Sequence, residues 1–264
     1  DSGIPDPLWS RGLGDVYKRQ EEARPYADRL SNVIVSLLPD VDRTLLPLLD
    51  YREVKREALV IVTGDRGMAG AFNANIIRRA EEEITKFGRE NVDLICIGRK
   101  GRDHFKVRGY DISAQYTDFW GDLGFTHATS FGEEIVSHFV DGSVDRVRVV
   151  YNWFRTIAVQ EIRVEDLLPL EYEEENVTAV DRLYEPSKDE IAHSLIPRHL
   201  NVQMWKYLLE SYASEQAARM LSMENATSNA QDMIKDLTLQ FNKARQAAIT
   251  TEMLEIVGGA EALG

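Results

Sequence analysis

Residues 197–257 read PRHLNVQMWKYLLESYASEQAARMLSMENATSNAQDMIKDLTLQFNKARQAAITTEMLEIV, and this stretch decides the fold. After Pro197 it contains no further proline, and the next glycine is Gly258. A single helix from Pro197 to Gly264 would be about 100 Å long, because each residue adds ~1.5 Å. Helices in globular proteins average about 11–12 residues. We therefore predict one continuous helix, from near Pro197 to near Ala260, that pairs with another helix or enters a partner protein.

An apolar stripe follows this helix at alternating spacings of four and three residues. The resulting 3.5-residue period is the heptad seam of a coiled coil. Several seam positions are small, so helix axes can approach closely while little area is buried, and stability must come from length and partners. A core helix of a bundle is the alternative interpretation. The seam consists of Met223, Thr227, Ala230, Ile234, Leu237, Phe241, Ala244 and Ala248.

The charge balance restricts the possible partners. The 264 residues carry a net charge of −13, with a pI near 4.9. This disfavours a nucleic-acid binder, which needs a cationic surface, and direct docking on anionic lipid. Acidic residues concentrate between Glu165 and Glu190, a run typical of a solvated connection. No run of 18 apolar residues is present, so the sequence predicts no membrane span.

The chain is expected to have five parts. Residues 1–20 are rich in turn residues and lack periodicity, and we interpret them as a non-native or artefactual leader. Residues 21–50 contain a helix that starts near Glu21, residues 51–170 form an α/β domain, and residues 171–196 are the acidic connection with a short helix. Residues 197–264 are the long C-terminal helix. Ser187 and Glu190 form a capping box for the short helix, and Pro197 suits the first turn of the long one.

The middle region alternates short apolar runs with helical patterns. We expect strands at residues 58–62, 92–97 and 111–116, with helices at 72–87, 99–107 and 130–140. Two further strands, 144–151 and 157–164, flank a predicted hairpin at Asn152 and Trp153. This order predicts a parallel sheet with an antiparallel edge. Cys96 lies in the second apolar run, which is typical of a buried strand thiol.

A glycine-containing loop, Thr63–Gly70, follows the first strand and leads into a helix, where phosphate-binding loops occur. Its spacing is G-x-x-G-x-x-G, which matches neither the dinucleotide fingerprint nor a P-loop. A tight strand-to-helix turn is the alternative explanation. The histidines are scattered, no zinc-ligand spacing occurs, and no catalytic signature is present. We therefore expect no catalytic residue, no metal and no cofactor.

Several segments resemble the γ subunit of F-type ATP synthase. The most specific is ITTEMLEIVGGAEA at the C-terminus, and the likeness covers roughly Glu21 to Leu263. The segments that carry it are Ala23–Tyr26, Asp65–Gly70 with Asn73, Ile196–Leu200, Ser214–Met220, Met223–Ala230, Asn242–Gln246 and Ile249–Ala262. The first 20 residues depart from the family, which begins with a basic helix that pairs with the C-terminal one. The resemblance implies a chain that lacks the first part of that N-terminal helix, and no cysteine pair for thiol regulation is present.

The resemblance also implies a function. The fold would be a Rossmann-like α/β domain with a long antiparallel coiled coil formed by the terminal helices. The coiled coil would be a rotor shaft inside the ring of ATP synthase α and β subunits, and the α/β domain would bind the ε subunit and the c-subunit ring. The subunit would perform no bond chemistry and would couple proton flow to ATP synthesis or hydrolysis on the β subunits. It would sit at the cytoplasmic face of a bacterial plasma membrane as a peripheral protein. Family contacts with β-subunit loops map to Arg245, Gln246, Thr250 and Glu252.

Two alternatives stay open at this point. A nucleotide-dependent enzyme with a Rossmann-like core would bind adenine nucleotides as an isolated chain, which equilibrium dialysis detects. A free-standing coiled-coil scaffold would self-associate, which sedimentation with and without α and β subunits detects.

Overall fold

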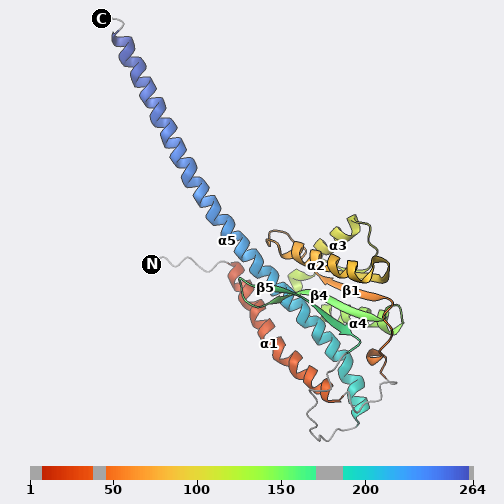
Figure 1. Cartoon of the computed structure of the whole chain (residues 1–264). Helices are drawn as coiled ribbons and strands as arrows, with labels where there is room; N and C mark the ends of the chain where they lie inside the picture. The colour runs from red at the N-terminus through yellow and green to blue at the C-terminus, as the bar shows by residue number, and fades with distance from the viewer. Residues whose placement is uncertain (1–7, 38–45, 171–186, 262–264) are drawn as a thin grey trace. The chain divides into compact units, whose positions relative to one another are not determined.

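The computed structural model describes residues 8–37, 46–170 and 187–261 (Figure 1). The chain divides into two compact units, Asp1–Arg219 and Met220–Gly264. Helix α5, Lys188–Glu261, starts in the first unit and supplies the described part of the second. The expected acidic connection falls largely on residues 171–186, which lie outside the described residues.

The first unit is built on a five-stranded sheet with the order β3-β2-β1-β4-β5. Its strands are β1 (Glu57–Val62), β2 (Val92–Ile97), β3 (Ile112–Tyr116), β4 (Arg146–Phe154) and β5 (Gln160–Leu168). Strand β1 pairs in parallel with β2 and β4, strand β2 pairs in parallel with β3, and β4 pairs with β5 antiparallel. The predicted parallel sheet with one antiparallel edge is confirmed.

Each face of the sheet has its own core. In β1, Leu59 and Ile61 face one cluster, whereas Val60 and Val62 face the other, as the two-residue period of a strand requires. The first cluster contains residues of α2 (Phe72–Phe87) and α3 (Arg99–Val107). The second contains residues of α1 (Leu8–Leu37), α4 (Phe125–Val140) and α5. The sheet is therefore a middle layer that is buried on both sides, which explains the continuous apolar run of β1. The short helices η3 (Pro47–Leu49), η4 (Arg89–Asn91) and η5 (Trp120–Asp122) connect these elements.

The hairpin between β4 and β5 turns later than the sequence predicts. Asn152 and Trp153 are strand residues that pair with Ile162 and Glu161. The turn lies at residues 155–159, where the Thr156 and Val159 main chains exchange hydrogen bonds of 3.0 and 3.2 Å. The prediction at Asn152–Trp153 was wrong because Asn152 is only 3% exposed and its main chain has partners in α5. Long-range contacts override the local turn preference of asparagine.

Helix α1 begins at Leu8, earlier than the start near Glu21 that the sequence pattern indicated. That expected start was wrong because residues such as Lys18, Arg19 and Gln20 are good helix formers, and a helix propagates easily once nucleated. The helix also continues through Pro25. The assignment of residues 1–20 as a non-native leader stays a prediction.

Helix α5 is continuous over 74 residues, as predicted, but it begins at Lys188 and includes the segment expected to be a separate short helix. Ser187 Oγ accepts the Glu190 N–H at 3.2 Å, so this half of the predicted capping box is confirmed, at the start of the long helix. Pro197 lies inside the helix and not in its first turn. An interior proline costs about 3 kcal/mol. Ile196 and Leu200, each 1% exposed, pack into the core beside it and offset that cost.

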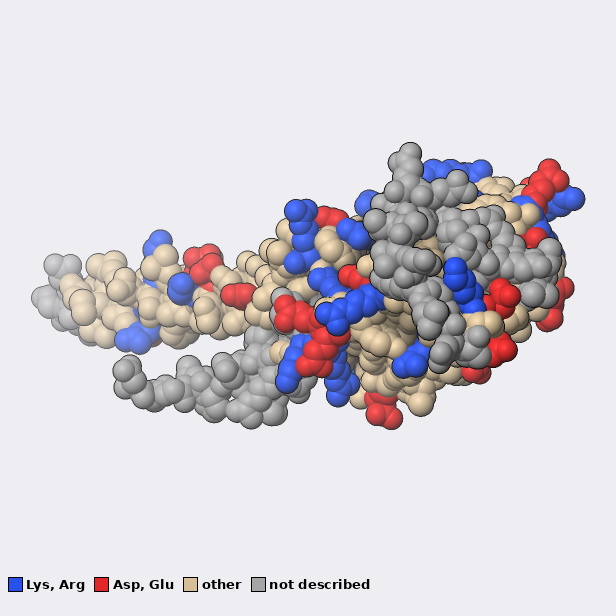
Figure 2. All heavy atoms as spheres, turned by 90° about the horizontal axis from the view of Figure 1, so that it is seen from below, with Lys and Arg blue, Asp and Glu red and all other residues tan. Residues whose placement is uncertain are grey.

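Charged side chains of both signs are interspersed over the face that Figure 2 shows. This distribution forms no single cationic area on that face, in agreement with the net charge of −13. Within the described ranges, none of the helices combines the length and the apolar character that a membrane span requires.

Candidate functional site

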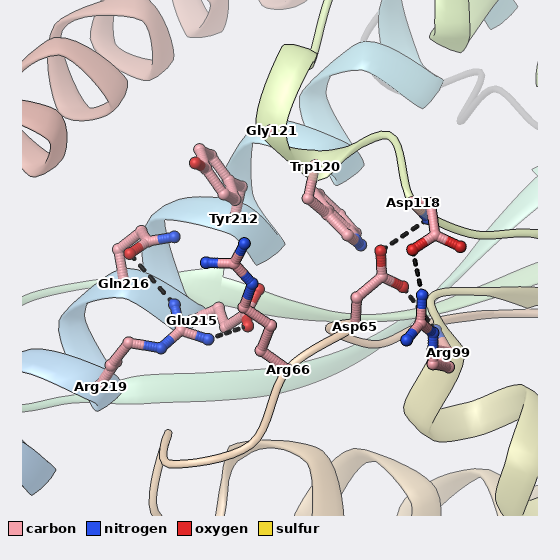
Figure 3. Close-up of a pocket in the computed structure, with 10 residues that line it drawn as sticks. All are labelled: Asp65, Arg66, Arg99, Asp118, Trp120, Gly121, Tyr212, Glu215, Gln216 and Arg219. Atoms are coloured by element: carbon pink, nitrogen blue, oxygen red, sulfur yellow. Dashed lines mark hydrogen bonds and ion pairs between the residues drawn. The ribbon is translucent and has the colours of Figure 1, made fainter.

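The carboxyl ends of the parallel strands meet at one edge of the sheet. The strand order reverses between β1 and β4, and open α/β sheets bind ligands in the crevice at such a point. Here a cavity of about 380 Å³ lies at this edge (Figure 3). It is lined by Asp65, Arg66, Arg99, Asp118, Trp120, Gly121, Tyr212, Glu215, Gln216 and Arg219. The last four residues belong to α5, so the helix itself forms one wall of the crevice.

Asp65 holds three loops together at this edge. One carboxylate oxygen accepts the Arg99 N–H after β2, and the other accepts the Asp118 N–H after β3, each at 2.7 Å. The Arg99 guanidinium forms an ion pair with the Asp118 carboxylate. Both oxygens of Asp65 are therefore engaged by main-chain donors, and its role in the loop is structural.

The glycine loop is filled by the protein's own side chains. The Gly64 N–H donates to Asn73 Oδ1 at 2.9 Å, and Asn73 Nδ2 donates to the Arg66 carbonyl at 3.2 Å. A Cβ on Gly64 would lie 2.5 Å from Glu215 Oε1, so a larger residue there would displace the Glu215 carboxylate from its position on α5. Glu215 places a negative side chain where a phosphate-binding loop would receive its ligand. The geometry therefore favours the tight-turn interpretation of this loop over the nucleotide-binding one.

Burial governs the electrostatics of the crevice. It raises the pKa of the Glu215 carboxyl, which is 3% exposed, while the ion pair with Arg219 opposes that rise. Trp120 stacks on Tyr212 with ring centroids 5.6 Å apart and an interplanar angle of 13°. The charged lining is balanced, with Arg66, Arg99 and Arg219 against Asp65, Asp118 and Glu215. This crevice joins α5 to the sheet.

The sequence did not single out Arg99, Asp118 or Trp120. A usable signal exists, because Arg99 directly follows the glycine after β2, and Asp118 and Trp120 come just after β3. Polar residues that follow parallel strands gather at the carboxyl edge of the sheet. Cys96 is fully buried in β2 as predicted, and burial raises the pKa of its thiol to about 12. In the part of the chain that the structure describes, no three His, Cys, Asp or Glu side chains gather as metal ligands.

The second unit contains the residues expected to contact β-subunit loops. Arg245, Gln246, Thr250 and Glu252 are all exposed on α5. Their spacing places Arg245 and Glu252 on one stripe, and Gln246 and Thr250 on the neighbouring stripe, because a helix repeats every 3.6 residues. Thr250 Oγ1 donates to the Gln246 carbonyl at 2.8 Å, which confirms that these two are adjacent. The structure thus brings the four residues together on about half of the helix surface. Their contacts with a partner stay a prediction.

The heptad seam is exposed along the same unit. Ile234 is 63% exposed, Leu237 56% and Phe241 66%, and the other seam residues are exposed as well. Large apolar side chains in a row on a helix surface mark an interaction face. A further partner along this seam stays a prediction.

Comparison with known proteins places the chain in a family. A family model described as ATP synthase matches residues 12–263, and many relatives named "ATP synthase gamma chain" are more than 40% identical. The chain belongs to the ATP synthase gamma chain family. The resemblance drawn from the sequence is therefore confirmed. The match begins at residue 12, inside the segment interpreted as a leader.

Two relatives illustrate the similarity. The chain is 44% identical to the gamma chain of Chlorobium phaeobacteroides (strain BS1) over 252 residues, which is 92% of this chain and 85% of the relative. It is 45% identical to that of Cytophaga hutchinsonii over 259 residues, 93% of this chain and 87% of the relative.

Solved structures share the fold. A chain of the central stalk and c-ring structure of the Tetrahymena thermophila mitochondrial ATP synthase has a TM-score of 0.65 at 20% identity. The match covers 83% of this chain and 96% of that one. A chain of the Euglena gracilis mitochondrial ATP synthase has a TM-score of 0.61 at 22% identity, covering 97% and 93%. The Rossmann-like α/β domain with a long helix is thus the fold of this family.

We predict that the isolated chain self-associates through the seam. Replacing Leu237→Gln and Phe241→Gln should weaken self-association about tenfold or more, because burying each such side chain contributes roughly 1.5–3 kcal/mol. Sedimentation equilibrium over a range of concentrations measures the effect. The matched control is Met233→Gln with Leu239→Gln, two exposed apolar residues outside the seam. Equal weakening by both pairs would mean that the seam has no special role.

Proposed function

We propose that this chain is the central rotor subunit of an F-type ATP synthase and couples proton flow through the membrane ring to ATP synthesis or hydrolysis. The observation that carries the proposal is the exposed, unbroken helix of the second unit. The apolar seam residues of this helix lie in water, and an exposed apolar stripe of this kind marks an interaction surface. A position inside a ring of α and β subunits would cover it.

The chemistry of the chain agrees with a mechanical role. The crevice at which α/β proteins bind ligands is lined by α5 and contains the buried Glu215 carboxylate. Because a carboxylate of the chain occupies this crevice, the alternative of a nucleotide-dependent enzyme is disfavoured. We infer that the subunit performs no bond chemistry and that its contribution is conformational coupling between distant sites.

The partners follow from the family. The second unit would contact the catalytic β subunits through Arg245, Gln246, Thr250 and Glu252. The α/β domain would bind the ε subunit and the ring of c subunits. Relatives from bacteria such as Chlorobium and Cytophaga support a position at the cytoplasmic face of a bacterial plasma membrane, where the chain would be peripheral.

Rotation is the direct test. Val107, at the end of α3, is 86% exposed, so Val107→Cys gives an attachment point for a bead on the α/β domain. We expect the bead to turn in one direction when the chain is assembled with immobilised α and β subunits and supplied with ATP. Hydrolysis without rotation would contradict a rotor.

The unsubstituted chain is the labelling control. Its single cysteine, Cys96, is buried, and the raised pKa keeps it a thiol at neutral pH, so it should not take up the label. Equilibrium dialysis of the isolated chain with ATP addresses the enzyme alternative, since specific binding would favour it.

A further inference from the structure

Strand β4 has an edge that the sheet leaves unpaired. Its pairing with β1 runs from Arg146 to Val150, whereas β4 itself continues to Phe154. Beyond Val150, β5 still pairs with one side of β4. The main-chain groups of Asn152 and Phe154 that face the other side therefore need different partners, because buried peptide groups are costly when unsatisfied.

Side chains of α5 take the place of the missing strand. Ser211 Oγ accepts the Asn152 N–H at 3.2 Å, and Ser214 Oγ donates to the Asn152 carbonyl at 3.4 Å. Two residues further along β4, Glu210 Oε2 accepts the Phe154 N–H at 3.0 Å. The helix thus provides donors and acceptors at the same two-residue repeat that a neighbouring strand would use.

The same helix turns are fixed from two other directions. Arg24 of α1 donates to both carboxylate oxygens of Glu210 at 2.5 and 2.8 Å, and also to the Phe154 carbonyl at 2.7 Å. At the end of β1, the Glu215 carboxylate lies against Gly64, so that a Cβ there would displace it. We name Glu210, Ser211, Ser214 and Glu215 the polar clasp; all four are 3% exposed or less.

The position of the clasp along α5 is informative. Its residues occupy two adjacent stripes of one helix face, and Ala213 and Ala217, beside the stripe of Glu210 and Ser214, pack on Phe154. The clasp ends just before Arg219, the last residue of the first unit. It therefore lies close to the end of the part of the helix that packs on the sheet within that unit.

A polar attachment has a different consequence from an apolar one. Apolar contacts are non-directional, so a small rotation or slip of a helix costs packing energy but leaves no polar group unsatisfied. A slip of one residue here would leave Asn152, Phe154 and Glu210 buried without hydrogen-bond partners, and each lost partner is costly. The clasp therefore specifies one angular register of α5 on the sheet.

We propose that the polar clasp is a torsional lock, which holds α5 at a fixed angle on the α/β domain so that torque passes between them without slip. Its residues are positioning residues for coupling. This inference rests on the proposed rotor function, and goes beyond it by naming where slip is prevented.

The test removes the hydroxyl groups and little else. Ser211→Ala with Ser214→Ala deletes two oxygen atoms and keeps good helix formers. In the isolated chain, we expect the Asn152 amide to exchange hydrogen about tenfold faster or more. In the assembled ATP synthase, we expect the number of protons pumped per ATP hydrolysed to fall roughly twofold or more. A twofold fall corresponds to equal populations of the native register of α5 and of a register in which the helix has slipped on the sheet.

The control is Leu208→Val, which trims a fully buried apolar residue on the same helix. It should lower the unfolding temperature while leaving the pumping ratio unchanged. An unchanged pumping ratio in the serine variant, despite faster exchange at Asn152, would overturn the lock and leave the rotor function standing. If the unsubstituted chain neither rotates nor supports pumping, the proposed function fails, and the torsional lock fails with it. The hydrogen-exchange result would then describe only how α5 packs on the sheet.

Discussion

Replacing Gly98→Ala should strongly destabilise the folded chain. Gly98 follows β2 with φ of +98°, a conformation that side chains with a Cβ rarely adopt. An added Cβ would lie 2.0 Å from the Thr63 carbonyl oxygen, which is main chain and cannot rotate away. The conformational strain costs about 1–3 kcal/mol and the overpacking about 1–3 kcal/mol more. Because native proteins are stable by only about 5–15 kcal/mol, a loss of this size removes a large part of the free energy of unfolding.

Gly98 also lies where the ends of three strands are joined by hydrogen bonds. The Gly98 N–H donates to the Tyr116 carbonyl, and the Thr63 N–H donates to the Ile97 carbonyl, each at 2.7 Å. Moving Gly98 would therefore break main-chain hydrogen bonds that join the ends of β1, β2 and β3. Urea unfolding measures the change, with Gly67→Ala as the control because nothing lies near a Cβ at Gly67. A Gly98→Ala chain as stable as the Gly67→Ala chain would show that the strand ends can move apart.

The sequence predicted those parts of the fold that depend on local pattern. The apolar runs that became β1 and β2, and the breaker-free stretch that became most of α5, are each specified by consecutive residues. A strand buried on both faces or a long helix leaves a periodic signal, and the order of strands and helices then restricts the topology.

Two errors arose where distant residues decide the local structure. Asn152 was expected in a turn, but Ser211 and Ser214 of α5 satisfy its main chain and keep it in β4. Pro197 was expected to begin a helix, but burial of Ile196 and Leu200 keeps the helix continuous through it. Neither effect is visible in a window of neighbouring residues, because the contacts join segments far apart in the chain.

The polar clasp was missed for a similar reason. Glu210, Ser211, Ser214 and Glu215 are polar, and polar residues on a helix usually indicate the solvated face. Here they form a buried face, because the unpaired edge of β4 requires hydrogen-bond partners. Predicting this from the sequence would require knowing that β4 is longer than β1 at that end. By contrast, the exposed contact residues of the second unit came from the family resemblance and not from any physical pattern.

In the assembled synthase, Arg245→Ala with Gln246→Ala should lower ATP turnover and ATP synthesis about 10- to 150-fold. Arg245 offers five donors in a rigid fork that suits carboxylate or carbonyl groups on a β-subunit loop, and Gln246 both donates and accepts. A charge-assisted hydrogen bond of this type contributes roughly 1.5–3 kcal/mol. If that bond forms in the rate-limiting rotational step, its loss gives the stated change in rate.

The substitutions should leave the subunit itself intact. Both side chains are exposed on α5, and alanine is the best helix former, so unfolding and assembly should change little. The matched control is Asn242→Ala with Lys243→Ala, two exposed polar residues on the preceding turn. Steady-state hydrolysis and proton pumping are measured for both pairs after assembly. Unaltered rates in the Arg245 and Gln246 variant would mean that the shaft acts through its shape alone. A loss limited to that pair would instead show that specific polar contacts hold a rotational dwell, because both pairs remove polar groups from the same exposed helix.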